Sequence, residues 1–174
     1  ELEARYDRMG LHATHDITGD DASIVKGLYV ELESAAGAIS VRTDGDALLG
    51  GLAAKAKGDI SIVETAGDVK LVTPTGWDAP QASLASEANV TLETVSGSIV
   101  DRAEGGLTNV KAVDVSLIAG GDDGQVGFVS DWAAGDLDAL SVTASGTLTA
   151  SGYRVVLDSR GPLTVTSIHG DDGV

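Results

Sequence analysis

The chain has 174 residues with 23 Gly, a formal net charge of −16, no Cys and only 3% aromatic residues. The lack of cysteine excludes disulfides and cysteine-ligated metal sites, and the negative charge disfavours nucleic acids and anionic lipid surfaces as partners. No run of eighteen apolar residues occurs, so we expect no insertion into a membrane. With so few rings, the core must be built from Val, Ile, Leu and Ala.

Residues 1–20 carry no copy of the pattern that recurs later in the chain. We therefore predict an N-terminal cap or irregular segment over 1–20 and a repeat array over 21–174, because solenoids need atypical ends. The chain starts at Glu1, with neither an initiator Met nor a signal peptide, and we expect it to be a piece of a longer protein.

From residue 21 onward, alternating apolar runs are joined by turns that contain glycine. The pattern is clearest in residues 28–41, 60–71 and 90–99. In the first of these, Leu28, Val30 and Leu32 share one side of an extended chain, which is typical of a strand with one buried face. The array is therefore built from short strands.

The glycines of these turns, Gly37, Gly67 and Gly97, are 30 residues apart. A fixed period in this range predicts stacked repeats, and a weaker third run such as 106–112 adds one more strand to each. We predict an all-β fold, a right-handed parallel β-helix with about three short strands per coil and the three glycines at equivalent corners. The alternative is an antiparallel β-sandwich, because Asp-Gly pairs such as Asp123-Gly124 suit hairpins.

Residues 89–121 resemble the β-strand repeats of very large bacterial surface proteins, the filamentous-haemagglutinin-like adhesins. The phrases Gly58-Asp-Ile-Ser-Ile62 and Gly67-Asp-Val-Lys-Leu71 are similar in style, and the likeness covers roughly residues 22–167. The resemblance implies a secreted, elongated stalk or filament for cell adhesion, located at the cell surface or outside the cell. It implies no catalytic residues in the repeats.

Paired aspartates in glycine turns are the candidate metal site. Calcium takes about six to eight oxygen ligands, often from Asp, so we predict calcium as the one possible cofactor. The alternative is a solvated turn in which Asp simply favours the local geometry. The pairs are Asp20 and Asp21, Asp122 and Asp123, and Asp171 and Asp172.

Trp77 and Trp132 are the candidate ligand-binding residues. Each lies next to an Asp in an irregular stretch, where an exposed indole could stack on a sugar ring. The alternative is that such a loop Trp folds back and covers the end of a ladder.

The outward residues of the predicted strands mix acids, bases and hydroxyls, without the acid-and-base grouping that a polysaccharide-cleaving site needs. We therefore predict no enzyme but a structural shaft, spacer or filament segment of a secreted bacterial surface adhesin or extracellular fibre. Its expected partners are neighbouring repeats, other copies of itself and cell-surface glycans. Two alternatives stay open: a carbohydrate-binding or carbohydrate-cleaving β-helix, and a fibre subunit that stacks end to end.

Overall fold

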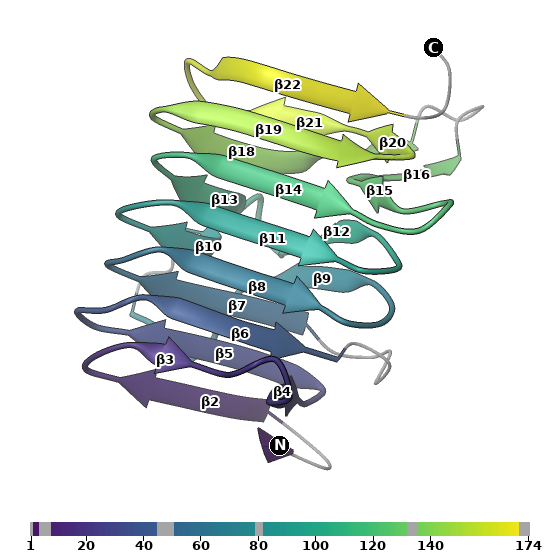
Figure 1. The fold of residues 1–174 in the computed structure, drawn as a ribbon. Coiled ribbons are helices and arrows are strands. Elements are labelled where there is room, and N and C mark those ends of the chain that lie inside the picture. Colours follow the sequence, from purple (N-terminus) through teal and green to yellow (C-terminus); the bar gives the residue numbers. More distant parts are fainter. Residues whose placement is uncertain (1, 4–7, 45–50, 79–81, 132–135, 171–174) are drawn as a thin grey trace.

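The computed structural model describes residues 2–3, 8–44, 51–78, 82–131 and 136–170. All regular structure in this part is β-strand, and the strands stack along one axis from β2 to β22 (Figure 1). The pairing is parallel, which confirms the predicted parallel β-helix. The sandwich alternative is wrong, because the only antiparallel pair among the described strands is β16 (Phe128–Asp131) with β17 (Asp136–Asp138).

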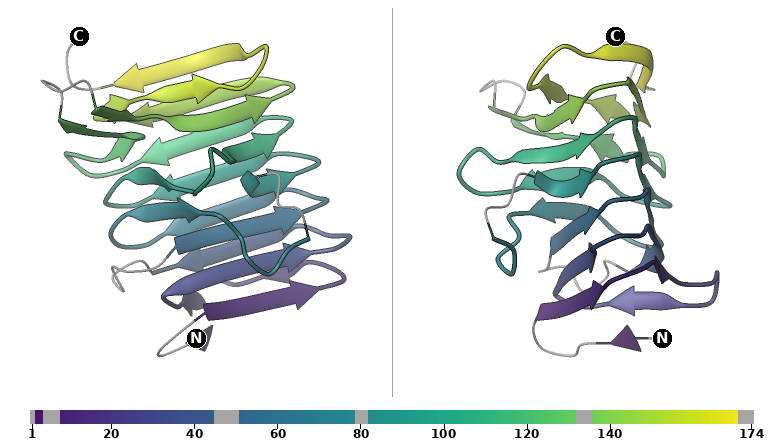
Figure 2. Two further views of the ribbon diagram at one scale, coloured as in Figure 1. Left: turned by 180° about the vertical axis from the view of Figure 1, so that it is seen from behind. Right: turned by 90° about the vertical axis from the view of Figure 1, so that its left-hand side faces the viewer.

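The coils that begin at β7, β10, β13 and β18 each have one short strand on each of three faces, in agreement with the predicted three per coil, and Figure 2 shows these faces from two further sides. The first face is the nine-stranded sheet: β1 (Leu2–Glu3), β3 (Ile17–Thr18), β4 (Ile24–Lys26), β6 (Ile39–Thr43), β8 (Ile60–Glu64), β11 (Val90–Thr94), β14 (Val115–Ala119), β19 (Thr147–Gly152) and β22 (Thr164–Gly170).

The eleven-stranded sheet supplies the other two faces. The second face contains β2 (Arg8–Ala13), β5 (Tyr29–Ser34), β7 (Gly51–Ala56), β10 (Ala82–Ser86), β13 (Thr108–Ala112), β18 (Leu140–Ala144) and β21 (Leu157–Ser159). The third face contains β9 (Val69–Val72), β12 (Ile99–Arg102), β15 (Gln125–Val126) and β20 (Arg154–Val155). A coil therefore runs from the second face to the first and then to the third.

The core consists of aliphatic ladders inside the coils. Every second residue of a strand points inward, and the parallel register places it on the equivalent residue of the next coil. One such ladder contains Ile39, Ile60, Val90, Val115 and Leu148, all buried. Burial of one such side chain stabilises the fold by about 1.5–3 kcal/mol. The core cluster of the described residues contains no aromatic ring, as the composition predicts.

The coils differ in length, which corrects one expectation. Along the ladder just given, successive steps are 21, 30, 25 and 33 residues. Gly37 lies between the second and first faces, whereas Gly67 and Gly97 lie between the first and third. The prediction that all three occupy equivalent corners is therefore wrong. A glycine turn between alternating runs occurs at both corners, as Gly37 and Gly67 show, so the local pattern does not tell them apart.

Gly97 shows why the corner between the first and third faces requires glycine. Its φ is +137°, which disfavours a residue with a side chain. A Cβ at this position would also collide with the carbonyl group of Gly67 in the preceding coil. The glycine therefore permits the close stacking of two coils.

The other corner, between the second and first faces, is held by side chains that reach the next coil. Asp59 Oδ1 accepts hydrogen bonds from the Asn89 backbone N–H and side-chain amide at 3.1 and 3.0 Å. Asn89 Oδ1 in turn accepts one from the Asp114 N–H at 3.3 Å, and Asp114 Oδ1 accepts one from the Thr147 N–H at 2.6 Å. Part of the chain's acidity therefore links coil to coil.

Residues 1–20, which we predicted as a cap or irregular segment, contain three strands in the structure. β2 pairs with β5 over six residues, and β3 pairs with β6. Met9 of β2 is buried in the core and Leu11 packs against it. The alternation is easy to miss because it is short, with Gly10 between the two apolar residues and His12 after them.

Candidate ligand-binding groove

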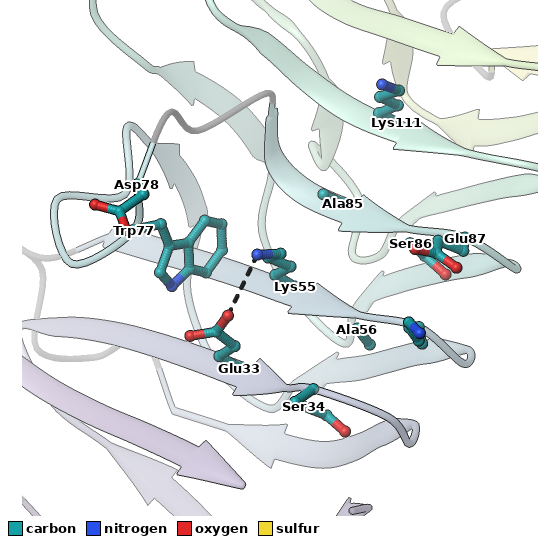
Figure 3. A pocket seen from close by; sticks show the side chains of 12 residues that line it. Glu33, Ser34, Lys55, Ala56, Trp77, Asp78, Ala85, Ser86, Glu87 and Lys111 are labelled. Atoms are coloured by element: carbon teal, nitrogen blue, oxygen red, sulfur yellow. Dashed lines mark hydrogen bonds and ion pairs between the residues drawn. The ribbon is translucent and has the colours of Figure 1, made fainter. Parts of the chain in front are cut away.

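Trp77, one of the two predicted ligand-binding residues, lies in the segment between β9 and β10. It folds back onto the second face and is only 9% exposed, so its ring offers little surface for stacking on a sugar. It still forms part of the wall of a groove (Figure 3). Its indole Nε1 is buried and has no hydrogen-bond partner. Trp132 lies outside the described residues.

A buried carboxylate holds the Trp77 segment in place. Glu31 of β5 points away from the core but is only 4% exposed, because residues 73–78, the covering loop, lie over it. Its carboxylate accepts hydrogen bonds from the Thr75 N–H (2.9 Å), the Thr75 hydroxyl (3.2 Å) and the Gly76 N–H (3.2 Å). Arg8 adds an ion pair at 3.7 Å. The covering loop is therefore fixed to the second face by a charge-assisted cluster.

The groove runs along the second face beside the covering loop. It consists of two adjoining hollows of about 580 and 680 Å³. They share Ser86, Glu87 and Lys111, so the groove is continuous from Glu33 to Arg160. Small side chains such as Ala85 line its middle and leave the space open.

One column of outward residues follows the groove. The register aligns, coil by coil, His12, Glu33, Lys55, Ala85, Lys111 and Thr143. Arg160 directly follows β21, donates its backbone N–H to the Val142 carbonyl, and lies in the groove with Thr143. The column brings together charged residues that are far apart in the sequence.

Glu33 is the one acid in this column and lies between His12 and Lys55. Its carboxylate contacts His12 Nδ1 at 2.9 Å and Lys55 Nζ at 3.3 Å (Figure 3 draws the second contact). The hydrogen bond with His12, followed by those with Lys55, lowers the pKa of Glu33. Glu33 is therefore ionised at neutral pH, which suits it to binding and not to general-acid chemistry.

The groove gathers basic residues in an acidic chain. Four of the eleven Lys and Arg residues line it: Lys55, Lys57, Lys111 and Arg160. Glu33, Glu87 and Asp78 are the acids that line it. The lining therefore has one more cation than acids in a chain with a charge of −16, a grouping that sequence reasoning missed. Only the register between coils could have identified it.

The predicted calcium residues lie in separate turns. Asp20 accepts a hydrogen bond from the Ala22 N–H at 3.2 Å, and its hydrogen bond with the Ser23 side chain is the main cause that lowers its pKa. Asp21 is 3.9 Å from Arg42. Asp122 and Asp123 are exposed in the turn before β15.

Asp171 and Asp172 lie outside the described residues. Within the described ranges, no group of three or more His, Asp or Glu side chains is arranged to hold a metal ion. Calcium binding by the acidic turns stays a prediction.

The outer surface of the first face is different again. One outward column consists of hydroxyl residues in consecutive coils: Thr18, Ser40, Ser61, Thr91, Ser116, Thr149 and Ser167. The neighbouring column is mixed, with Arg42, Val63, Glu93, Ile118 and Ser151. Unequal coil lengths hide this column in the sequence as well.

No protein-family model, no curated protein and no solved structure matches the chain. The resemblance to filamentous-haemagglutinin-like adhesins therefore rests on the sequence phrases alone. Within the part that the structure describes, no helix has the length and apolar character to cross a membrane.

Proposed function

We propose that this chain is a non-catalytic structural segment, a shaft or spacer of a bacterial protein at the cell surface or outside the cell. The observation that supports the proposal is the continuous ladder of the first face. β6, β8, β11 and β14 align residue for residue over five positions, and β19 continues the same register. Such a stack is quasi-one-dimensional: each coil contacts its neighbours, and length grows with coil number.

Force spectroscopy on single molecules tests the shaft. The chain is pulled between handles at its two ends, and we expect stepwise release of coils, about 100 Å for a coil of 30 residues at about 3.4 Å per residue. A matched chain with residues 60–89 duplicated should add one step of that size. Smooth extension at low force, with no steps in either chain, would contradict the proposal.

An activity screen tests the non-catalytic part of the proposal. Neutral and acidic polysaccharides are incubated with the chain, and new reducing ends and unsaturated products are measured. We expect no release above that of heat-denatured chain. Release that Glu33→Gln abolishes would instead make the protein a carbohydrate-cleaving β-helix.

End-to-end stacking is a second candidate, and it is supported by the state of β22. All seven residues of β22 are exposed, and among the described strands it pairs only with β19. Val165 and Ile168 continue the ladders of Leu148 and Ala150 but are 49% and 50% exposed. A second copy could cover them.

Sedimentation velocity over a range of concentrations tests this candidate. It predicts elongated oligomers that the double variant Val165→Asp with Ile168→Asp abolishes and that the control Thr164→Asp retains. A monomer at every concentration would remove the candidate.

A further inference from the structure

We propose that the groove on the second face binds one extended acidic polysaccharide, with the sugar chain along the stack axis and its carboxylates on the basic column. The proposal goes beyond the shaft function and does not depend on it. It is argued from the groove's length, the spacing of its charges, an unsatisfied donor in its wall and the state of its backbone groups.

The groove is long enough for an extended ligand. It runs from β5 to the residues after β21, crossing β7, β10, β13 and β18 on the way. At about 4.8 Å per strand step, this is about 24 Å. The small residues Ala85, Ser86 and Ala144 line the groove beside Lys111, so they leave room for a ligand next to its ammonium group.

The basic residues of the column recur in every second coil. Lys55 lies on β7, Lys111 on β13 and Arg160 directly after β21, while the small residues Ala85 and Thr143 lie between them on β10 and β18. Two strand steps correspond to about 10 Å. In an extended polysaccharide whose sugars flip from one unit to the next, carboxylates return to the same side at every second sugar. The basic residues and the sugar carboxylates therefore follow the same order, in which every second position carries a charge.

Existing ion pairs leave these residues with donors for a ligand. Lys55 contacts Glu33 at 3.3 Å, and Arg160 contacts Asp158 through Nε at 3.2 Å. A lysine ammonium has three N–H donors and a guanidinium has five, so each can also donate to a sugar carboxylate. Lys57, at the turn after β7, adds a fourth cation at the rim.

Trp77 supplies an independent sign that this wall meets a polar ligand. Its Nε1–H is a buried donor without a partner, although buried polar groups are normally hydrogen-bonded. In Figure 3 the nitrogen side of the ring faces Glu33, next to Lys55. A small shift of the indole would let a sugar hydroxyl accept this hydrogen bond.

The backbone of the second face argues against a peptide as the ligand. An extended peptide binds a sheet by adding a strand at a free edge. The strands that form the floor of the groove, β7, β10, β13 and β18, each pair with a neighbour on both sides. A peptide therefore cannot add a strand to this floor, and a ligand in the groove is recognised through side chains, as a polyhydroxylated and carboxylated chain would be.

The test is a calorimetric titration of the whole chain with an oligomer of β-1,4-linked mannuronate long enough to span the groove. EDTA is present so that calcium cannot bridge acid to acid. The same oligomer with its carboxylates methyl-esterified is the matched control ligand. We expect one oligomer bound per chain, weaker binding at higher salt, and at least tenfold weaker binding of the ester.

Three variants locate the binding. Lys111→Gln, in the middle of the column, should weaken binding of the acidic oligomer about tenfold, and Lys57→Gln at the rim should weaken it less. Lys70→Gln, on the third face and outside the groove, removes the same charge and should leave binding unchanged. Circular dichroism confirms that each variant is folded; should Lys111→Gln fail to fold, the rim variant still decides the question.

Three outcomes overturn the proposal: no binding of the acidic oligomer, equal binding of the ester, or an equal loss with Lys70→Gln. None of them affects the force measurement that tests the shaft, so the two proposals fail separately.

Discussion

The outer surfaces of the first and second faces differ although the same ladders lie behind both. On the first face, outward residues such as Ser61 and Thr91 are partly exposed to solvent. On the second face, the outward residues Glu31, Ser83 and Asn109 are buried. The covering loop lies over Glu31, and Asn109 is held by Asp101 and Ser141. The pattern of inward residues therefore determines the coil, and the connecting segments that cover a face determine whether its outward residues can form a binding site.

The largest expected loss of stability distinguishes the buried ladders from the outer surfaces of both faces. Leu92→Asp places a charge among fully buried aliphatic side chains, and we expect the chain to be unfolded at 25 °C because an unpaired buried charge costs several kcal/mol. Thr91→Asp, one residue away and outward, should leave the melting temperature within a few degrees of the parent's. Thermal unfolding followed by circular dichroism measures both. Similar melting temperatures for the two variants would show that the inward assignment is wrong.

A smaller effect separates the two outer surfaces. Glu31→Gln replaces one carboxylate oxygen by an NH₂ group, which then faces the backbone N–H of Thr75 or Gly76 instead of accepting its hydrogen bond. We therefore expect a loss of about 1–3 kcal/mol in the free energy of unfolding. Glu93→Gln on the first face is the matched control and should change it by less than about 0.5 kcal/mol. Urea unfolding gives both values. Equal losses would mean that the covering loop is not held by Glu31.

The smallest effect concerns the corner that the two faces share. Hydrogen bonds from the Thr147 N–H and hydroxyl lower the pKa of Asp114 from its ordinary 3.8. A group with a lowered folded-state pKa stabilises the fold above its unfolded pKa, and this contribution is lost as pH falls through the folded value.

We therefore expect the melting temperature of the parent to drop more steeply below about pH 4 than that of Asp114→Asn, which cannot titrate there. Asp122→Asn, in an exposed turn, removes the same charge without this link and should follow the parent. Thermal scans between pH 5 and pH 2 make the comparison. A parallel course of Asp114→Asn and the parent would argue against the linkage.

The sequence predicted the ladders well because a strand that buries one face has alternating apolar and polar residues. Val30, Leu32 and Leu92 alternate with polar residues, and all three are buried in the structure. The parallel β-helix was predicted from the 30-residue step between glycines, although that step was carried partly by Gly37, which lies at a different corner. Alternation every two residues can be recognised within one strand. The face on which a residue lies depends on connections whose lengths vary.

The groove was out of reach for the same reason. Glu31 looks like a solvated outward residue, and nothing nearby in the sequence indicates its bonds to Thr75, 44 residues later. Lys55 and Lys111 belong to one column only after the register of β7, β10 and β13 is known. Trp77 was a candidate because a loop Trp beside an Asp can stack on a sugar ring, and its buried position agrees with the other interpretation, that such a Trp folds back.

The distribution of connection lengths suggests how such a protein could change over evolutionary time. Turns from the second face to the first contain two to four residues in every coil, whereas the connections from the third face to the second, β9 to β10, β12 to β13, β15 to β18 and β20 to β21, contain 9, 5, 13 and 1. The length of the chain at this edge of the second face can therefore vary without moving the ladders. That edge is a natural place for grafted loops, so new recognition properties could be exchanged on an unchanged scaffold.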